Sequence, residues 1–126
     1  MMRPLSLDSL RYWMRIRQAW LPTRISENEC EIVSLNSLAA DRGIGTALIA
    51  EVKEKAAEGG CRRIWLITTN DNVAAMRFYQ KRGFSFAAIY INALEETRRV
   101  KPELSLTGFD GIPLRDEIEL ELLLNG

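Results

Sequence analysis

Residues 70–84 read NDNVAAMRFYQKRGF, and this stretch decides the fold because an apolar stripe at helical spacing runs into a glycine. The spacing predicts a helix over residues 72–82 that ends at Gly83. The apolar positions of that helix are Val73, Met76, Phe78 and Tyr79. Residues 84–91, FSFAAIYI, are rich in β-prone side chains and predict a strand. The chain here therefore passes from a helix into a sheet.

The segments before this stretch predict a helix, a hairpin and a second helix. Residues 6–21 space their apolar side chains for an amphipathic helix that stops before Pro22, although they would also serve as an irregular strand. Residues 23–38 resemble two short strands around a polar turn. Apolar residues within 45–58 recur at helical spacing, which predicts a helix, and the glycines at 59–60 are expected to cap it.

The remaining segments complete an α/β pattern. The run RRIWLIT at 62–68 is continuously apolar after its arginines, which predicts a strand covered on both faces. Residues 93–100 predict one or two helical turns, residues 106–113 a loop, and residues 115–124 a final strand. We therefore expect an α/β fold in which a sheet of mixed strand direction is flanked by helices.

Composition favours one small domain over residues 1–126. The chain is 47% hydrophobic and 27% charged, and 17 basic residues balance 17 acidic ones. A zero net charge argues against nucleic acid or a membrane surface as partner, and no apolar run approaches the roughly 20 residues that span a bilayer. No signal-peptide pattern opens the chain, so we expect a cytoplasmic protein. Without histidine, Cys30 and Cys61 have no zinc-site spacing and are expected to be buried thiols, so no metal is predicted.

A Gly-x-Gly lies between a predicted strand and a predicted helix, in LNSLAADRGIGTALI at residues 35–49. Unpaired backbone N–H groups and the helix dipole suit this point to a phosphate, and Gly43 and Gly45 remove side chains that would keep it away. The alternative is that both glycines only make a tight turn. The stretch lacks the Lys of a P-loop, and Leu48 stands where a dinucleotide fingerprint needs a small residue.

The two stretches together resemble the GNAT superfamily of N-acetyltransferases. An x-x-G-x-G after a strand precedes N-x-x-A-x-x-F-Y-x-x-x-G-F in the same order here. The second pattern is complete in Asn72, Ala75, Phe78, Tyr79, Gly83 and Phe84. The resemblance covers about residues 23–124, with residues 1–22 as an atypical N-terminal segment. It implies a GNAT-like acyl-CoA N-acyltransferase fold with a mixed, mostly antiparallel sheet.

The resemblance also implies that acetyl-CoA is the acetyl donor. The backbone of a splayed strand near Leu35 would bind the pantetheine arm, the N–H groups of residues 40–47 the pyrophosphate, and Asn72 the pantetheine chain beside Phe78. The implied cofactor-binding residues are Leu35, Asn36, Ser37, Ala40, Asp41, Arg42, Gly43, Ile44, Gly45, Thr46, Ala47, Asn72, Ala75 and Phe78.

Tyr79 is the expected general acid, because a phenol can protonate the thiolate that leaves when an amine attacks the thioester. Core packing is the alternative role for this side chain. Glu29 and Glu31 lie on one face of a predicted strand, and either would serve as the base, with Glu31 preferred, unless both are simply solvated. Direct transfer is expected, because neither cysteine has an activating neighbour.

The sequence departs from the family at two places. Ala40 stands where a Gln or Arg usually opens the glycine loop, although Arg42 is close enough to supply charge. The part before EIVSL, at residues 31–35, is shorter than in most members and lacks elements that form one wall of the acceptor site. Three explanations of this short part compete. The chain is naturally short and completes its sheet by forming a homodimer, or its start has been truncated or altered. In the third, residues 6–21 replace the missing wall with their aromatic side chains.

The expected function is therefore transfer of an acetyl group from acetyl-CoA to a primary amine of a small molecule, peptide or protein. The alternative is a non-catalytic acyl-CoA-binding or regulatory module with an incomplete acceptor site. Tyr79 and the glutamates favour the enzyme, because a binding module needs no acid for a leaving group.

Overall fold

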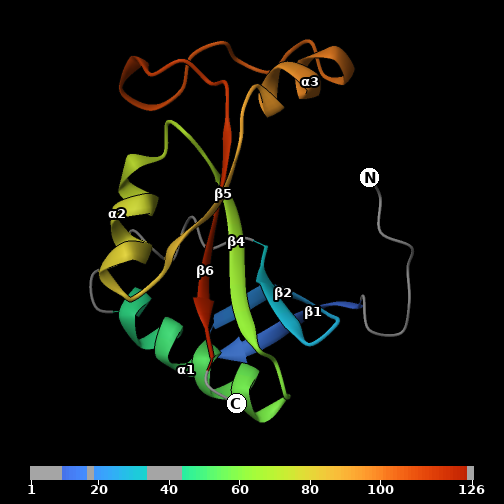
Figure 1. Cartoon of the computed structure of the whole chain (residues 1–126), viewed down its shortest axis with the longest axis vertical. Helices are drawn as coiled ribbons and strands as arrows, with labels where there is room; N and C mark the ends of the chain where they lie inside the picture. Colours follow the sequence, from blue (N-terminus) through green and yellow to red (C-terminus); the bar gives the residue numbers. More distant parts are fainter. Residues whose placement is uncertain (1–9, 17–18, 34–43, 125–126) are drawn as a thin grey trace. The chain divides into compact units, whose positions relative to one another are not determined.

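The computed structural model describes residues 10–16, 19–33 and 44–124, and for 10–16, 19–26 and 44–45 it gives the secondary structure alone (Figure 1). The chain divides into two compact units. Residues up to Leu66, together with those from Leu122 onward, form the first unit, and Ile67–Glu121 form the second.

The strands of the first unit lie in the order β1 (Leu10–Ile16), β2 (Ala19–Ser26), β3 (Glu29–Ile32) and β4 (Arg63–Thr69). β1 and β2 pair antiparallel, β2 and β3 pair antiparallel, and β3 and β4 pair parallel. The predicted mixed, mostly antiparallel sheet is therefore confirmed.

The predicted helix over residues 6–21 is wrong where the structure describes it, because β1 and the first three residues of β2 occupy this range. In LRYWMRI, Arg11 and Arg15 alternate with apolar neighbours except at Trp13, and Tyr, Trp and Ile favour strands. The pairing with β2, from Leu10 opposite Ile25 to Ile16 opposite Ala19, outweighs the helical spacing. Pro22 does not stop an element but lies within β2, just outside Thr23–Ser26, the part paired with β3.

The predicted hairpin is confirmed as β2 and β3 joined by Glu27 and Asn28. Both turn residues have positive φ, 54° and 64°, which is the geometry of a type I′ turn. Asn adopts this region readily, whereas Glu does so at a cost.

Glu27→Asn should therefore stabilise the protein by roughly 0.5–1 kcal/mol, because Asn tolerates a left-handed φ better than Glu. Denaturant unfolding measures the change. Glu27→Ala is the matched control, since it removes the same exposed charge without relieving the backbone, and it should give no stabilisation. Equal stabilisation by both variants would mean that the charge, not the turn, is responsible.

The predicted helix and its glycine cap are confirmed by α1 (Ile44–Glu58). Gly60 has φ +79°, its N–H donates to the Ala57 carbonyl at 3.1 Å, and the Cys61 N–H donates to the Ala56 carbonyl at 2.9 Å. This pattern is a Schellman cap, in which Cys61 and Ala56 are both buried.

The second unit contains α2 (Val73–Lys81), β5 (Ser85–Tyr90), α3 (Ala93–Val100), a 3₁₀ turn (Phe109–Gly111) and β6 (Glu117–Leu123). The last residues of β6 belong to the first unit. The helices, strands and loop predicted after residue 72 are confirmed.

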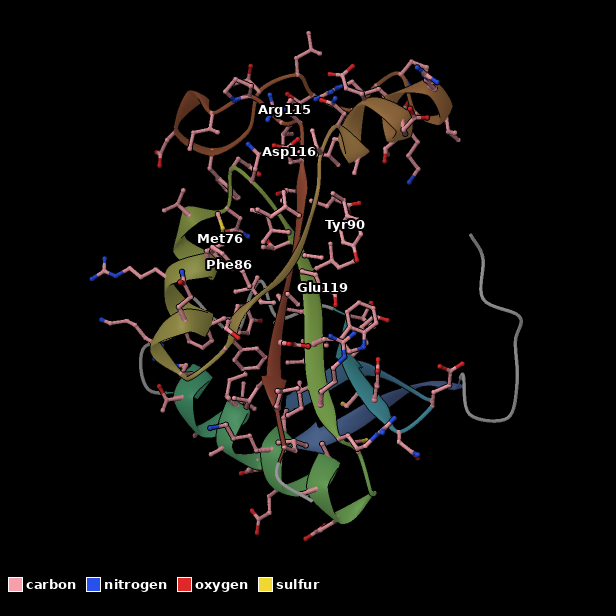
Figure 2. The ribbon with its side chains drawn as sticks, viewed as in Figure 1. Met76, Phe86, Tyr90, Arg115, Asp116 and Glu119 are labelled. Carbon is pink, nitrogen blue, oxygen red and sulfur yellow. The ribbon has the colours of Figure 1, made fainter. Side chains whose placement is uncertain are left out.

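A β-bulge at Ala87 sets the two faces of the antiparallel β5–β6 pair. Phe86 pairs with Leu120, whereas Ala88, two residues later, pairs with the adjacent Glu119. Paired residues share a face, so Phe86 and Leu120 lie on one face, and Ala88 and Glu119 on the other. Figure 2 shows Glu119 beside Tyr90.

Each unit contains its own set of buried apolar residues. In the first unit the buried apolar residues are Cys30, Ile32, Leu48, Ile49, Val52, Ala56, Cys61, Ile64 and Leu66, and in the second they are Tyr79, Phe84, Leu94, Ile118 and Leu120. Ile64 and Leu66 of β4 are buried, but Ile67 is 39% exposed, so the expected cover on both faces is not complete. No helix in the described part of the chain has the length and apolar character to cross a membrane.

Candidate active site

Asn72 is the N-cap of α2. Its Oδ1 accepts a hydrogen bond from the Ala75 N–H at 3.2 Å, which satisfies one of the unpaired donors of the first turn. The Asn-x-x-Ala spacing of the motif therefore has a structural cause in addition to the implied contact with pantetheine. Figure 2 shows Met76 on this helix, one residue beyond Ala75.

The Tyr-x-x-x-Gly-Phe spacing is also explained by a helix cap. Gly83 has φ +99°, and its N–H donates to the Gln80 carbonyl at 3.1 Å, while the Phe84 N–H donates to the Tyr79 carbonyl at 3.0 Å. The Tyr79 and Phe84 rings meet with centroids 5.2 Å apart. These are the hydrogen bonds and the apolar contact of a Schellman motif.

Tyr79 is only 4% exposed, and its ring also contacts Phe78 edge-on at 5.1 Å between centroids. Burial raises the pKa of the Tyr79 phenol above its ordinary value, because the phenolate would lose its hydration. The hydroxyl therefore stays protonated at neutral pH, as a general acid must be. The packing role and the acid role are compatible in this side chain.

Arg82, which the sequence did not single out, lies beside Phe78. Its guanidinium carbon is 3.8 Å from the ring centroid, and its NH1 donates to the Phe78 carbonyl at 2.9 Å. A cation over an aromatic ring is favourable, and this contact holds the Phe78 ring at the end of α2. The signal available in the sequence was the i, i+4 spacing of the pair.

The glutamates predicted as bases occupy one face of β3, as expected. Glu29 and Glu31 are half-buried, whereas Cys30 between them is buried. Glu29 Oε1 forms an ion pair with Arg63 Nε at 3.2 Å, and the Arg63 guanidinium lies 5.3 Å from the Trp65 ring centroid. Glu31 is the residue paired with Trp65 in register. The structure thus commits Glu29 to Arg63.

The predicted donor-binding residues fall into three groups. Leu35, Asn36, Ser37, Ala40, Asp41, Arg42 and Gly43 lie outside the described residues. Ile44, Gly45, Thr46 and Ala47 form the first turn of α1, in the first unit. Asn72, Ala75, Phe78 and Tyr79 come together on α2, in the second unit.

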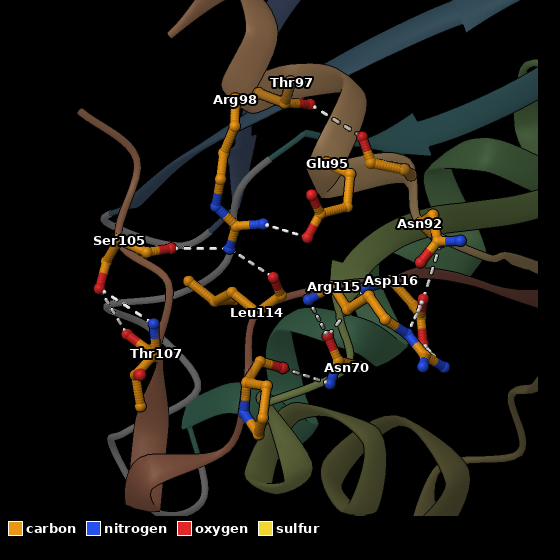
Figure 3. A network of polar contacts seen from close by, with 12 residues as sticks. Asn70, Asn92, Glu95, Thr97, Arg98, Ser105, Thr107, Leu114, Arg115 and Asp116 are labelled. Atoms are coloured by element: carbon orange, nitrogen blue, oxygen red, sulfur yellow. Dashed lines mark hydrogen bonds and ion pairs between the residues drawn. The ribbon is translucent and has the colours of Figure 1, made fainter. Parts of the chain in front are cut away.

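The turn between β4 and α2 carries polar residues whose role the sequence did not reveal. Asn70 Nδ2 donates to the Pro113 carbonyl at 2.9 Å, and its Oδ1 accepts from the N–H groups of Arg115 and Asp116, each at 3.0 Å (Figure 3). These partners lie more than 40 residues away in sequence. The signal available in the sequence was a cluster of polar residues after a strand, but such a cluster does not indicate which distant residues it binds.

Asp116 joins the same network from the start of β6. Its Oδ1 accepts from the Asn92 N–H at 2.8 Å, and both of its carboxylate oxygens accept from the Arg115 guanidinium. These contacts hold the pKa of Asp116 below its usual range, with the Arg115 hydrogen bond as the main cause. The carboxylate thereby fixes the entry to α3.

Within the described residues, no group of His, Cys, Asp and Glu side chains is arranged to hold a metal ion. The first unit offers the carboxylates of Glu29 and Glu31, and the second offers the protonated phenol of Tyr79.

A family model of the acetyltransferase (GNAT) family matches residues 13–84. Among curated proteins, the chain is similar to the uncharacterized protein YdhI of Bacillus subtilis (strain 168), with 55% identity over 94 residues that cover 75% of this chain and 59% of YdhI. The uncharacterized protein YxbD of the same organism is 47% identical with the same coverage. The chain thus spans 59% of the length of these curated relatives.

Solved structures share the fold. An acetyltransferase of Bacillus subtilis in complex with CoA has a TM-score of 0.69 and 24% identity, covering 91% of this chain and 76% of that one. A GNAT family acetyltransferase from Elizabethkingia anophelis with acetyl-CoA bound has a TM-score of 0.68 and 21% identity, covering 87% and 72%. At such identities the likeness supports the architecture, and function must be argued from the site.

Proposed function

Because the chain belongs to the GNAT acetyltransferase family, we propose that it transfers an acetyl group from acetyl-CoA directly to a primary amine of a small molecule, peptide or protein. The observation that carries the proposal is the complete motif on α2. It holds a buried, protonated Tyr79 one residue after Phe78 and seven residues after the cap Asn72.

The helix ends support acetyl-CoA as the donor. The first turns of α1 and α2 contain no acidic side chain, so their positive dipole ends suit an anionic group. Gly45, in the first turn of α1, has no Cβ to keep a phosphate from the backbone. Similar structures with CoA or acetyl-CoA bound point to the same donor. When bound, acetyl-CoA supplies the reactive thioester.

The proposed residues then divide the chemistry. The amine nitrogen bonds to the acetyl carbon as the carbon–sulfur bond breaks, and Glu31 takes the proton that the amine loses. Tyr79 donates its phenolic proton to the leaving sulfur. As in the sequence analysis, Glu31 is preferred to Glu29 as the base.

The cysteines support direct transfer rather than an acetyl-cysteine intermediate. Cys30 and Cys61 are buried free thiols. Burial, together with the nearby Cys61 and Glu31, raises the pKa of Cys30 to about 12, and burial also raises the pKa of Cys61. A thiol that stays protonated is a poor nucleophile.

Isothermal titration of the folded protein with acetyl-CoA, followed by assay of thiol release with a panel of amines, tests the function. We expect binding and amine-dependent release of CoA. Absence of binding by a folded sample would contradict the proposal. Binding without release for any amine class would favour the non-catalytic acyl-CoA-binding module instead.

We also propose a cytoplasmic homodimer as the working form. The free thiols of Cys30 and Cys61 suit a reducing compartment, where disulfides are rare. The homodimer is the expectation already given in the sequence analysis. Sedimentation of the titrated sample gives the chain mass in solution, and a monomeric mass would contradict the dimer.

A further inference from the structure

The short turn between β4 and α2 is braced by a distant part of the chain. Asn72, the last residue of this turn, has its backbone fixed locally: its N–H donates to the Thr69 carbonyl at 3.0 Å, and the Val73 N–H donates to the Asp71 carbonyl at 2.9 Å. A shift of the Asp71 backbone therefore passes to its neighbour Asn72. The side chain of Asn70, as described above, holds the segment at residues 113–116.

Asp71 forms the second brace. Its side chain is buried, with 4% of the residue exposed, and it accepts hydrogen bonds from the Thr69 hydroxyl and from the Phe109 N–H, the latter at 2.9 Å. Gly108 packs so closely that a Cβ there would overlap the Asp71 carboxylate. The segment at residues 105–116 thus presses directly on the turn that leads into α2.

The same segment has another anchor that does not touch the turn. Arg98 of α3 donates to the carbonyls of Ser105, at 2.8 Å, and Leu114, and forms an ion pair with Glu95 at 3.1 Å (Figure 3). Loosening this anchor removes the Arg98 contacts and leaves those of Asn70 and Asp71 in place. The N–H groups of Asn92 and Leu94 still hold Asp116 and Arg115 at the start of α3. The two anchors can therefore be tested separately.

We propose that Asn70 and Asp71 are positioning residues that make the placement of Asn72, and with it the affinity for acetyl-CoA, depend on the 105–116 segment. This inference rests on the proposed function, because it takes Asn72 as a donor contact. Asn70 and Asp71 act through Asn72 and do not touch the donor. The 105–116 segment becomes a remote determinant of donor binding, with Phe109 lying 38 residues from Asp71 in sequence.

Gly108→Ala tests the proposal by disturbing the contact between Gly108 and Asp71 without changing Asp71 itself. The new Cβ should displace the Asp71 carboxylate and weaken acetyl-CoA binding about tenfold in isothermal titration, within the range of coupling through a packed network. Gly111→Ala is the matched control in the same segment. It imposes backbone strain at φ +73°, but its Cβ meets nothing within 4 Å, so donor affinity should be unchanged.

A second pair of variants guards against misfolding. Asn70→Ala should weaken acetyl-CoA binding, whereas Arg98→Ala should not, even where it lowers the thermal midpoint more. Equal affinity in Gly108→Ala and Gly111→Ala, or losses that follow the thermal midpoint in all four variants, would overturn the inference.

Amide hydrogen exchange at Ala75 separates this inference from the proposed function. The Ala75 N–H reports the Asn72 cap, so it should exchange about tenfold faster in Gly108→Ala than in Gly111→Ala, with no ligand present. If wild-type protein does not bind acetyl-CoA, the proposed function fails, and exchange at Ala75 still shows whether the brace acts on Asn72. Equal exchange in both variants would overturn the brace itself.

Discussion

Tyr79→Phe is expected to lower turnover with a good amine acceptor by about 100-fold, while the affinity for acetyl-CoA stays nearly the same. The substitution removes only the hydroxyl, and the ring keeps its edge-on contacts with Phe78 and Phe84. A loss confined to kcat therefore reports the acid role and not the packing role. Steady-state kinetics beside isothermal titration of the same sample separates the two parameters.

Tyr90→Phe is the matched control for this variant. It also removes a tyrosine hydroxyl from the second unit, one that donates to Glu119 Oε1 at 2.6 Å. Loss of that hydrogen bond should lower stability by about 1 kcal/mol without the loss of turnover. Equal kinetics in wild type and Tyr79→Phe would eliminate the phenol as the acid.

The pH dependence of the turnover rate tests the acid role of Tyr79 independently. Since burial raises the pKa of Tyr79, the phenol loses its proton only above the ordinary value of about 10. The acid should therefore remain active from neutral pH up to at least about pH 10. An alkaline loss of rate centred near pH 8 in the wild type and missing in Tyr79→Phe would contradict a buried phenol.

Gly45→Glu is expected to abolish acetyl-CoA binding. The variant places a side chain and a negative charge in the first turn of α1, where the proposed pyrophosphate needs close approach to the backbone and a positive helix end. Repulsion and lost contact act together, so we expect an affinity loss of more than about 100-fold, as when a buried charge lacks a partner. Isothermal titration measures it.

Gly59→Glu controls for the added charge at the opposite end of the same helix. A Cβ at Gly59 meets its nearest atoms, Lys55 O and Ala56 O, at ordinary contact distances of 3.5 and 3.6 Å. This variant has the same net charge as Gly45→Glu and should bind acetyl-CoA normally. Undiminished binding by Gly45→Glu would mean that the glycines only form a turn.

The second half of the fold could be predicted from the sequence because its signals are local. The helix over residues 72–82, its end at Gly83 and the strand after Phe84 each depend on neighbours within a turn or two of the chain. The helix predicted for residues 6–21 was wrong because the deciding contact is not local. Their aromatic and arginine residues fit either period, and pairing with β2 decides between them.

The site shows the same division. The motif residues lie together on α2, but the roles of Asn72 as a cap and of Tyr79 as half of a Schellman contact could be read only from the structure. Nothing near Glu29 in the sequence indicates Arg63, which reaches it across a parallel strand pair. The partners of Asn70 lie equally beyond any local pattern.

The bulge at Ala87 bears on how the protein stays dispersed in water. β5 is an edge strand, paired on one side with β6, and it carries Phe86 and Ile89 at 50% and 57% exposure. A straight strand here would offer apolar side chains and a regular backbone ladder to any passing chain. One unpaired residue breaks that ladder and twists the strand locally. Deleting Ala87 would keep every paired side chain on its present face, yet it would straighten the strand. A bulge of this kind is a general means of limiting strand-to-strand aggregation through the backbone alone, without a charge or a large side chain.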